Sequence, residues 1–212
     1  MKNILVAMLL TSPLVSMASL AAEQPYDACV GQFTSTETKA TYEDFDFWIG
    51  EWQVVATETG ELRGYDKIKM IHNGCVLQQE WHQMDDVFSN PNAPVRLRGT
   101  SLTGIDAQGR WRQLWTDNFG SNILLTGGLD NDGTMTLTSE WTEVPTQTGA
   151  RVKIRNIWHW ALQDDGSIHN WGERQRGSET GPKTKYYDIT YHRSVIGGRV
   201  FGFRNPNPEE QN

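Results

Sequence analysis

The stretch RVKIRNIWHWAL, residues 151–162, alternates between two kinds of side chain along most of its length. Charged residues occupy every second position at its start, and a set of mainly apolar residues occupies the other positions: Val152, Ile154, Asn156, Trp158 and Trp160. A period of two is typical of a β-strand with one face in solvent and the other in a core. We therefore predict a strand here, with Arg151, Lys153 and Arg155 outward and the tryptophans inward.

The same alternation recurs along the chain and predicts ten strands: 51–58, 65–72, 75–83, 95–105, 110–118, 121–129, 134–142, 151–162, 167–176 and 185–194. Glycine-containing dipeptides separate many of them, and such dipeptides favour tight hairpin turns: Asn73-Gly74, Gln108-Gly109, Phe119-Gly120, Asp132-Gly133 and Asp165-Gly166. Strands joined in order by short turns form a meander. When a meander closes into a barrel, its first and last strands pair and no exposed edge remains. The predicted fold is all-β: a single antiparallel up-and-down β-barrel of about ten strands over 41–204, preceded by a short irregular or helical segment.

The two ends of the chain do not share this alternation. Residues 1–21 begin with Lys2 after the initiating methionine, continue as an apolar run and end in small residues, as secretory signal peptides do. Residues 22–40 are expected to form an N-terminal extension and residues 205–212 a polar C-terminal tail. We therefore expect an exported protein, periplasmic or secreted, without stable membrane insertion.

The composition narrows the class of partner. The chain has 212 residues and a net charge of -7, and a nucleic-acid partner is not expected because such binding usually requires a basic patch. Nine tryptophans in a chain with only 37% hydrophobic residues suit an aromatic-lined pocket for a small molecule. Charges on the outer face also oppose an outer-membrane barrel, whose outer face is apolar. The pattern specifies no oligomeric state.

The only two cysteines, Cys29 and Cys75, both follow the predicted signal peptide. In an oxidising compartment two cysteines most simply form one disulfide, which would tie the N-terminal extension to the barrel. No CxxC motif is present, so a redox or nucleophilic cysteine is not favoured.

The predicted inward faces carry both aromatic and polar side chains. A barrel of this strand number can enclose a ligand cavity, and aromatic walls with a few convergent polar groups are typical of small-molecule sites. The alternative is a packed core whose polar groups are hydrogen-bonded to each other. The residues predicted to contact a ligand are Trp111, Gln113, Trp115, Asp117, Asn156, Trp158, Trp160 and Tyr191.

Several segments together resemble a known family. They are FDFWIGEW at 45–52, GCVLQQEW at 74–81, GTSL at 99–102 and WRQLWTD at 111–117. This combination is similar to a widespread bacterial family of uncharacterised domains with a calycin-like, or lipocalin-like, barrel. The resemblance covers about residues 42–194 and implies a barrel fold and small-ligand binding, without an established reaction.

Gly50-Glu-Trp52 also looks like the GxW motif of the first lipocalin strand. In lipocalins an arginine from the last strand packs across that tryptophan and closes one end of the barrel. The resemblance implies that Arg193 has this role over Trp52. A guanidinium on an indole face stabilises by about 0.5–2 kcal/mol.

Two further hypotheses remain open at this point. The first is an enzyme on the same barrel, an isomerase, cyclase or hydrolase of a small organic substrate, with a carboxylate pair drawn from Asp117, Glu80 and Glu173. The alternative for these residues is that Asp117 caps a turn while Glu80 and Glu173 face solvent. The second hypothesis is a haem-binding barrel with a single histidine ligand, for which His72 lies on a predicted inward face. Apart from haem no cofactor is expected, and no metal-binding motif is present.

Overall fold

The computed structural model describes residues 41–87, 95–196 and 199–200. The predicted signal peptide at 1–21, the extension at 22–40 and the tail at 205–212 lie outside the described residues. Cys29 also lies outside them, so its disulfide with Cys75 stays a prediction.

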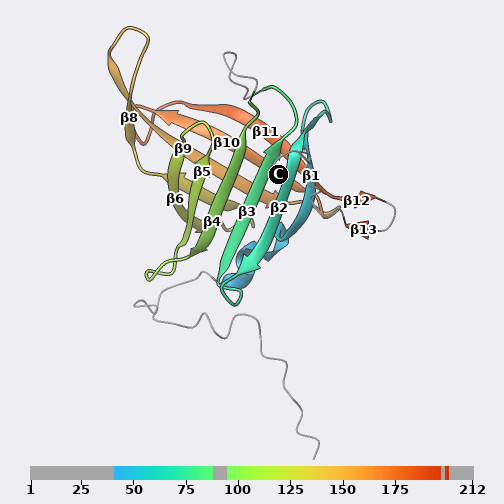
Figure 1. Cartoon of the computed structure of the whole chain (residues 1–212). Helices are drawn as coiled ribbons and strands as arrows, with labels where there is room; N and C mark the ends of the chain where they lie inside the picture. The colour runs from blue at the N-terminus through green and yellow to red at the C-terminus, as the bar shows by residue number, and fades with distance from the viewer. Residues whose placement is uncertain (1–40, 88–94, 197–198, 201–212) are drawn as a thin grey trace, which may run out of the picture.

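The strands form a closed antiparallel barrel, as the alternation predicts (Figure 1). Each strand of the ring pairs with its neighbour along the chain, β9 pairs with β10, and the ring closes where β1 pairs with β11. The elements are η2 (Tyr42–Trp48), β1 (Gly50–Ala56), β2 (Leu62–Ile71), β3 (Val76–Gln83), β4 (Arg98–Ile105), β5 (Trp111–Asp117), β6 (Asn122–Leu129), β7 (Met135–Ser139), β8 (Thr142–Pro145), β9 (Arg151–Leu162), β10 (Ile168–Arg176), β11 (Lys183–Arg193), β12 (Val195–Ile196) and β13 (Arg199–Val200).

The predicted strand at 134–142 is wrong in one respect, because the structure divides this region into β7 and β8. Both pair with the long strand β9, β8 with its first half and β7 with its second. Between β7 and β8, Trp141 donates a hydrogen bond to Glu179, 3.0 Å away, and the Arg155 guanidinium lies 4.7 Å from the centre of its ring. Contacts of Trp141 outside the barrel thus stabilise the break between β7 and β8. Strand β8 extends beyond the rim of the barrel (Figure 1).

The predicted glycine turns all adopt positive φ, which allows the tight reversals between strands. Gly109, Gly120, Gly133 and Gly166 have φ between 73° and 88°. In the remaining turn, His72 and Asn73 share the left-handed conformation with Gly74. His72 therefore lies exposed in a turn, and its predicted place on an inward strand face is wrong.

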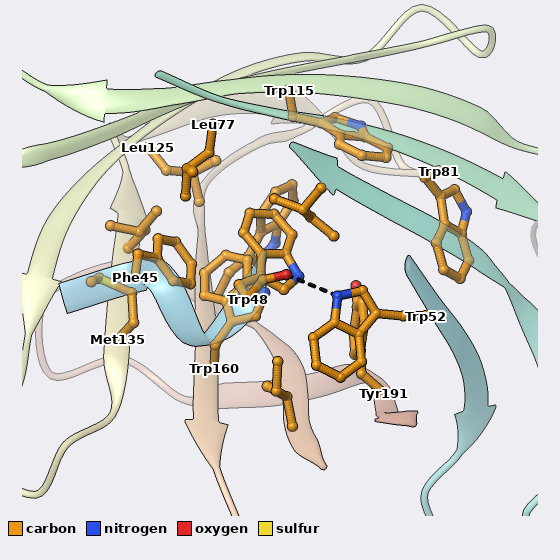
Figure 2. Packing of buried hydrophobic residues seen from close by; sticks show 14 of the residues in the cluster. Phe45, Trp48, Trp52, Leu77, Trp81, Trp115, Leu125, Met135, Trp160 and Tyr191 are labelled. Atoms are coloured by element: carbon orange, nitrogen blue, oxygen red, sulfur yellow. Dashed lines mark hydrogen bonds between the residues drawn. The ribbon is translucent and has the colours of Figure 1, made fainter. Parts of the chain in front are cut away.

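A 3-10 helix with two buried aromatic residues closes one end of the barrel. Asp44 caps the first turn of η2 by accepting hydrogen bonds from the backbone N–H and the hydroxyl of Thr41. The helix carries Phe45 and Trp48, both fully buried, into the barrel, where their rings stack with centres 4.9 Å apart. Figure 2 shows both rings within the hydrophobic cluster beside Trp160. We call this end the floor.

Arg193 lies over Trp52 at the floor. Its guanidinium carbon is 4.0 Å from the centre of the indole ring, and Nη1 donates to the carbonyl of Ile49 at 2.7 Å. A Cβ at Gly50 would lie only 2.0 Å from Arg193 Nη1, so the glycine of the GxW motif makes room for the arginine. Trp52 Nε1 donates to the carbonyl of Trp48 at 2.8 Å, which joins η2 to β1 (Figure 2).

Candidate functional site

A cavity of about 250 Å³ occupies the part of the barrel away from the floor. β5 shows its position: Trp111 at the start of this strand packs against Phe45 of η2, whereas Asp117 at its end lines the cavity. The lining residues described are Gln79, Trp81, Leu97, Trp115, Asp117, Phe119, Ser121, Ile123, Asn156, Trp158, Trp160, Asn170, Arg174, Tyr186, Tyr187 and Tyr191.

Aromatic rings in edge-to-face contact form most of the cavity wall. Trp158 is at their centre, with ring centres 6.0 Å from Trp115, 6.3 Å from Trp160 and 6.4 Å from Tyr187. Its indole N–H donates to the hydroxyl of Tyr186. Because these contacts join rings from β5, β9 and β11 across the barrel, the wall offers large apolar surfaces in fixed orientations.

Two glycines let wall rings lie flat on the strand beside them. A Cβ at Gly99 of β4 would lie 2.1 Å from the Trp115 ring, and one at Gly172 of β10 would lie 2.1 Å from the Tyr187 ring. Sequence reasoning did not identify these positions. The available signal was a glycine that pairs with an inward aromatic residue on the next strand, or lies next to such a pair. A glycine within a strand often marks a place where another group approaches the backbone closely.

Gly99→Ala should displace the Trp115 ring and disturb the cavity wall. The new methyl group meets the ring itself, so the indole must rotate away or the strand must shift. We expect a changed near-ultraviolet circular dichroism spectrum and a lower midpoint of thermal unfolding. Gly128→Ala is the matched control, since a Cβ there meets no atom within 4 Å. Equal effects of the two variants would contradict this role for Gly99.

Asp117 combines a turn cap with a place on the cavity wall. Its Oδ1 accepts from the backbone N–H groups of Phe119 and Ser121, and its Oδ2 accepts from Trp115 Nε1 at 2.9 Å. Burial alone would raise the pKa of Asp117, but the hydrogen bonds from Ser121, Trp115 and Phe119 outweigh it and lower the pKa. The carboxylate is therefore ionised at neutral pH and orients the Trp115 ring.

A buried hydrogen-bonded chain runs around the barrel beside the cavity. Its centre is Asp66, which is fully buried on β2 and accepts from Gln79 Nε2 at 2.7 Å and from the Tyr191 hydroxyl at 2.9 Å. Ser101 donates to Gln79 Oε1, and Gln113 donates to Ser101. Gln79 and Tyr191 line the cavity, so the chain connects Asp66 to its surface.

Burial raises the pKa of Asp66 to about 8, although the hydrogen bonds from Gln79 and Tyr191 act in the opposite direction. Its Oδ1 is buried without a hydrogen-bond partner among the described residues, which adds to the cost of a charge there. The side chain is therefore protonated at neutral pH. Sequence reasoning missed Asp66, although it shares the period-two face of Ile68 and Met70 on the same predicted strand.

Two side-chain atoms of lining residues have no hydrogen-bond partner within the described part of the chain. Asn156 Oδ1 and Trp160 Nε1 are both buried and unbonded among the described residues. Asn170, by contrast, donates to the carbonyl of His159 at 2.7 Å. Burial raises the pKa of Tyr186 to about 12, so its hydroxyl stays neutral.

The structure brings together most of the residues predicted to contact a ligand, but not all of them. Trp111 and Gln113 point into the barrel yet do not line the cavity. Trp111 belongs to the floor, 6.3 Å from Tyr42 between ring centres. Gln113 is fully buried and donates to Ser101 and to Thr103. Gln79, two strands away on β3, lines the cavity in its place.

The carboxylates proposed for catalysis do not converge. Glu80 lies on the outer face of β3 and pairs with Lys69, and Glu173 lies on the outer face of β10 beside His159. Asp117 is the only carboxylate among the described residues that line the cavity. No histidine is among the described lining residues either.

Within the described residues, no helix is long and apolar enough to cross a membrane. The same part of the chain contains no group of three or more histidine, cysteine, aspartate or glutamate side chains arranged to hold a metal ion. No family model matches the chain, and no curated protein matches it. The function is therefore inferred from the geometry of the cavity itself.

Proposed function

We propose that this chain is an exported binding protein of the calycin-like kind that holds a small, partly apolar molecule in the aromatic cavity. The observation that carries the proposal is the cavity wall itself. It joins indole and phenol rings, fixed by edge-to-face contacts, with a few polar side chains, among them Asn156, Asn170 and Arg174. Apolar walls with few convergent polar groups are typical of ligand sites.

The size of the cavity favours a compact ligand. Its volume of about 250 Å³ is near the lower end of the range for small-molecule pockets. The floor rings Phe45 and Trp48 are fully buried, so the barrel is filled on the floor side of the cavity. A molecule with one or two rings fits this space and can contact several of the wall aromatics.

Native mass spectrometry of the protein purified from its own host tests the proposal directly. We expect a mass increase that corresponds to a small organic molecule and disappears on denaturation. N-terminal sequencing of the same sample would test export, since cleavage after residue 21 is expected. If the protein is recovered without a ligand, binding of a neutral aromatic probe, naphthalene-2-carboxamide, is measured by calorimetry.

Trp115→Ala should weaken binding of naphthalene-2-carboxamide by about tenfold or more, since the loss of an aromatic contact and its buried area removes roughly 1–2 kcal/mol. Trp171→Ala is the control, because this tryptophan lies on the outer face of β10 between His159 and His169. Both variants lose one tryptophan, but only the first is part of the cavity wall. Equal affinities of wild type and Trp115→Ala would contradict the proposed site.

A further inference from the structure

Arg174 is the only cation among the described residues that line the cavity. It lies near the end of β10, with its guanidinium carbon 5.0 Å from the centre of the Tyr186 ring. Its Nε is buried and has no hydrogen-bond partner among the described residues. The ring contact leaves the planar N–H donors of the guanidinium free to bind an acceptor.

The cation also lacks an acidic partner in the described part of the chain. Many other cations of the barrel are paired on its outer face, for example Arg155 with Glu179 and Lys69 with Glu80. None of the ion pairs between described residues involves Arg174. A partly buried guanidinium without a counter-ion is unfavourable unless an anion or water completes its hydrogen bonds.

The one carboxylate of the cavity wall does not fill this role. Both oxygens of Asp117 are engaged by Trp115 Nε1 and by the backbone of the β5–β6 turn. The barrel order also separates the two side chains, because β6, β7 and β9 lie between β5 and β10. The cavity therefore presents an unpaired positive group on one wall and aromatic rings around it.

We propose that the ligand is an organic anion, with an aromatic or other compact apolar body and a carboxylate or similar acidic group bound by Arg174. This inference rests on the proposed function and specifies the ligand class of the same cavity. A carboxylate matches the planar donors of arginine in two parallel hydrogen bonds, while the apolar body packs against Trp158 and Trp115. The net charge of the protein is -7, so the overall charge of the chain does not itself attract anions.

The test compares two probes that differ only in charge, naphthalene-2-carboxylate and naphthalene-2-carboxamide, by calorimetry at pH 7. Wild type should bind the carboxylate about 10- to 100-fold more tightly, the range expected for a charge-assisted hydrogen bond. Arg174→Gln should remove this preference and leave carboxamide binding within about twofold, whereas Arg174→Lys should retain part of it. Arg112→Gln, on the outer face of β5, is the matched control and should keep the full preference.

The outcomes separate the two proposals. Equal wild-type affinities for the two probes would overturn the anion inference and leave the proposed binding function intact. Arg174→Gln that weakens both probes equally would also overturn it, because Arg174 would then only support the wall. Failure of both probes to bind would count against the proposed function itself. If Arg174→Gln does not fold, the affinities of Arg174→Lys and the salt dependence of wild-type binding are measured instead. Added salt should weaken binding of the carboxylate only, and equal effects of salt on the two probes would overturn the inference.

Discussion

Trp48→Ala should lower the free energy of unfolding by about 3–5 kcal/mol, the usual range for removing a large aromatic side chain from a core. Trp48 is fully buried, and its ring centre lies 4.9 Å from Phe45 and 5.4 Å from Trp160. Its carbonyl also accepts the hydrogen bond from Trp52 Nε1 (Figure 2). The substitution would leave a cavity among rings that hold one another, and η2 would lose one of its two buried anchors.

Urea unfolding followed by far-ultraviolet circular dichroism measures this effect. Leu102→Ala is the control, because Leu102 is 44% exposed on the outer face of β4 and should change stability by less than about 1 kcal/mol. The probe affinities of any folded Trp48→Ala protein should change less than those of Trp115→Ala, since Trp48 is not among the described lining residues. Equal losses of stability for Trp48→Ala and Leu102→Ala would show that η2 does not hold the floor.

The sequence alone predicted the barrel because period-two alternation and glycine turns are local signals. Strand β9 illustrates this: the charges of Arg151 and Lys153 are exposed, and Trp158 and Trp160 are buried, as the alternation requires. The division into β7 and β8 was not predictable in this way. It depends on contacts of Trp141 with Arg155 and Glu179, which are distant in sequence.

The candidate site was predicted only in part. The alternation of a strand shows which of its residues face inward, but not how far along the barrel axis each of them lies. Trp111 and Trp115 share an inward face, yet one packs on the floor and the other lines the cavity. Depth depends on how far η2 enters the barrel, which strand alternation does not specify. Trp81 and Trp171, for which the sequence predicted no position, also differ in location. Trp81 lines the cavity, whereas Trp171 stacks between two histidines on the outer face.

Asp66 should make the wild-type protein less stable as pH rises from about 4 to about 8. Burial raises its folded-state pKa from 3.8 to about 8, so in this window the folded chain holds a proton that the unfolded chain has released. Its contribution to stability is complete below the unfolded pKa and is lost as pH rises through the folded pKa. The slope from this one group is at most about 1.4 kcal/mol per pH unit.

Asp66→Asn isolates this term, because the carboxamide keeps an acceptor for Gln79 and Tyr191 but does not titrate. The difference in unfolding free energy between wild type and variant should change steadily in favour of the variant between pH 4 and pH 8. Asp117→Asn is the opposite control: hydrogen bonds lower the pKa of Asp117, so its contribution is lost only as pH falls. Urea unfolding across this pH range measures both differences.

The titration of Asp66 also bears on binding, because Tyr191 and Gln79 join it to the cavity wall. Above pH 8 a carboxylate at Asp66 would draw the donors of both residues more strongly and place a negative charge near the ligand. We therefore expect naphthalene-2-carboxylate to bind more weakly above pH 8 in wild type than in Asp66→Asn. If the difference in unfolding free energy between wild type and Asp66→Asn stays constant from pH 4 to pH 8, Asp66 is already ionised in the folded protein. Burial would then not raise its pKa as inferred here.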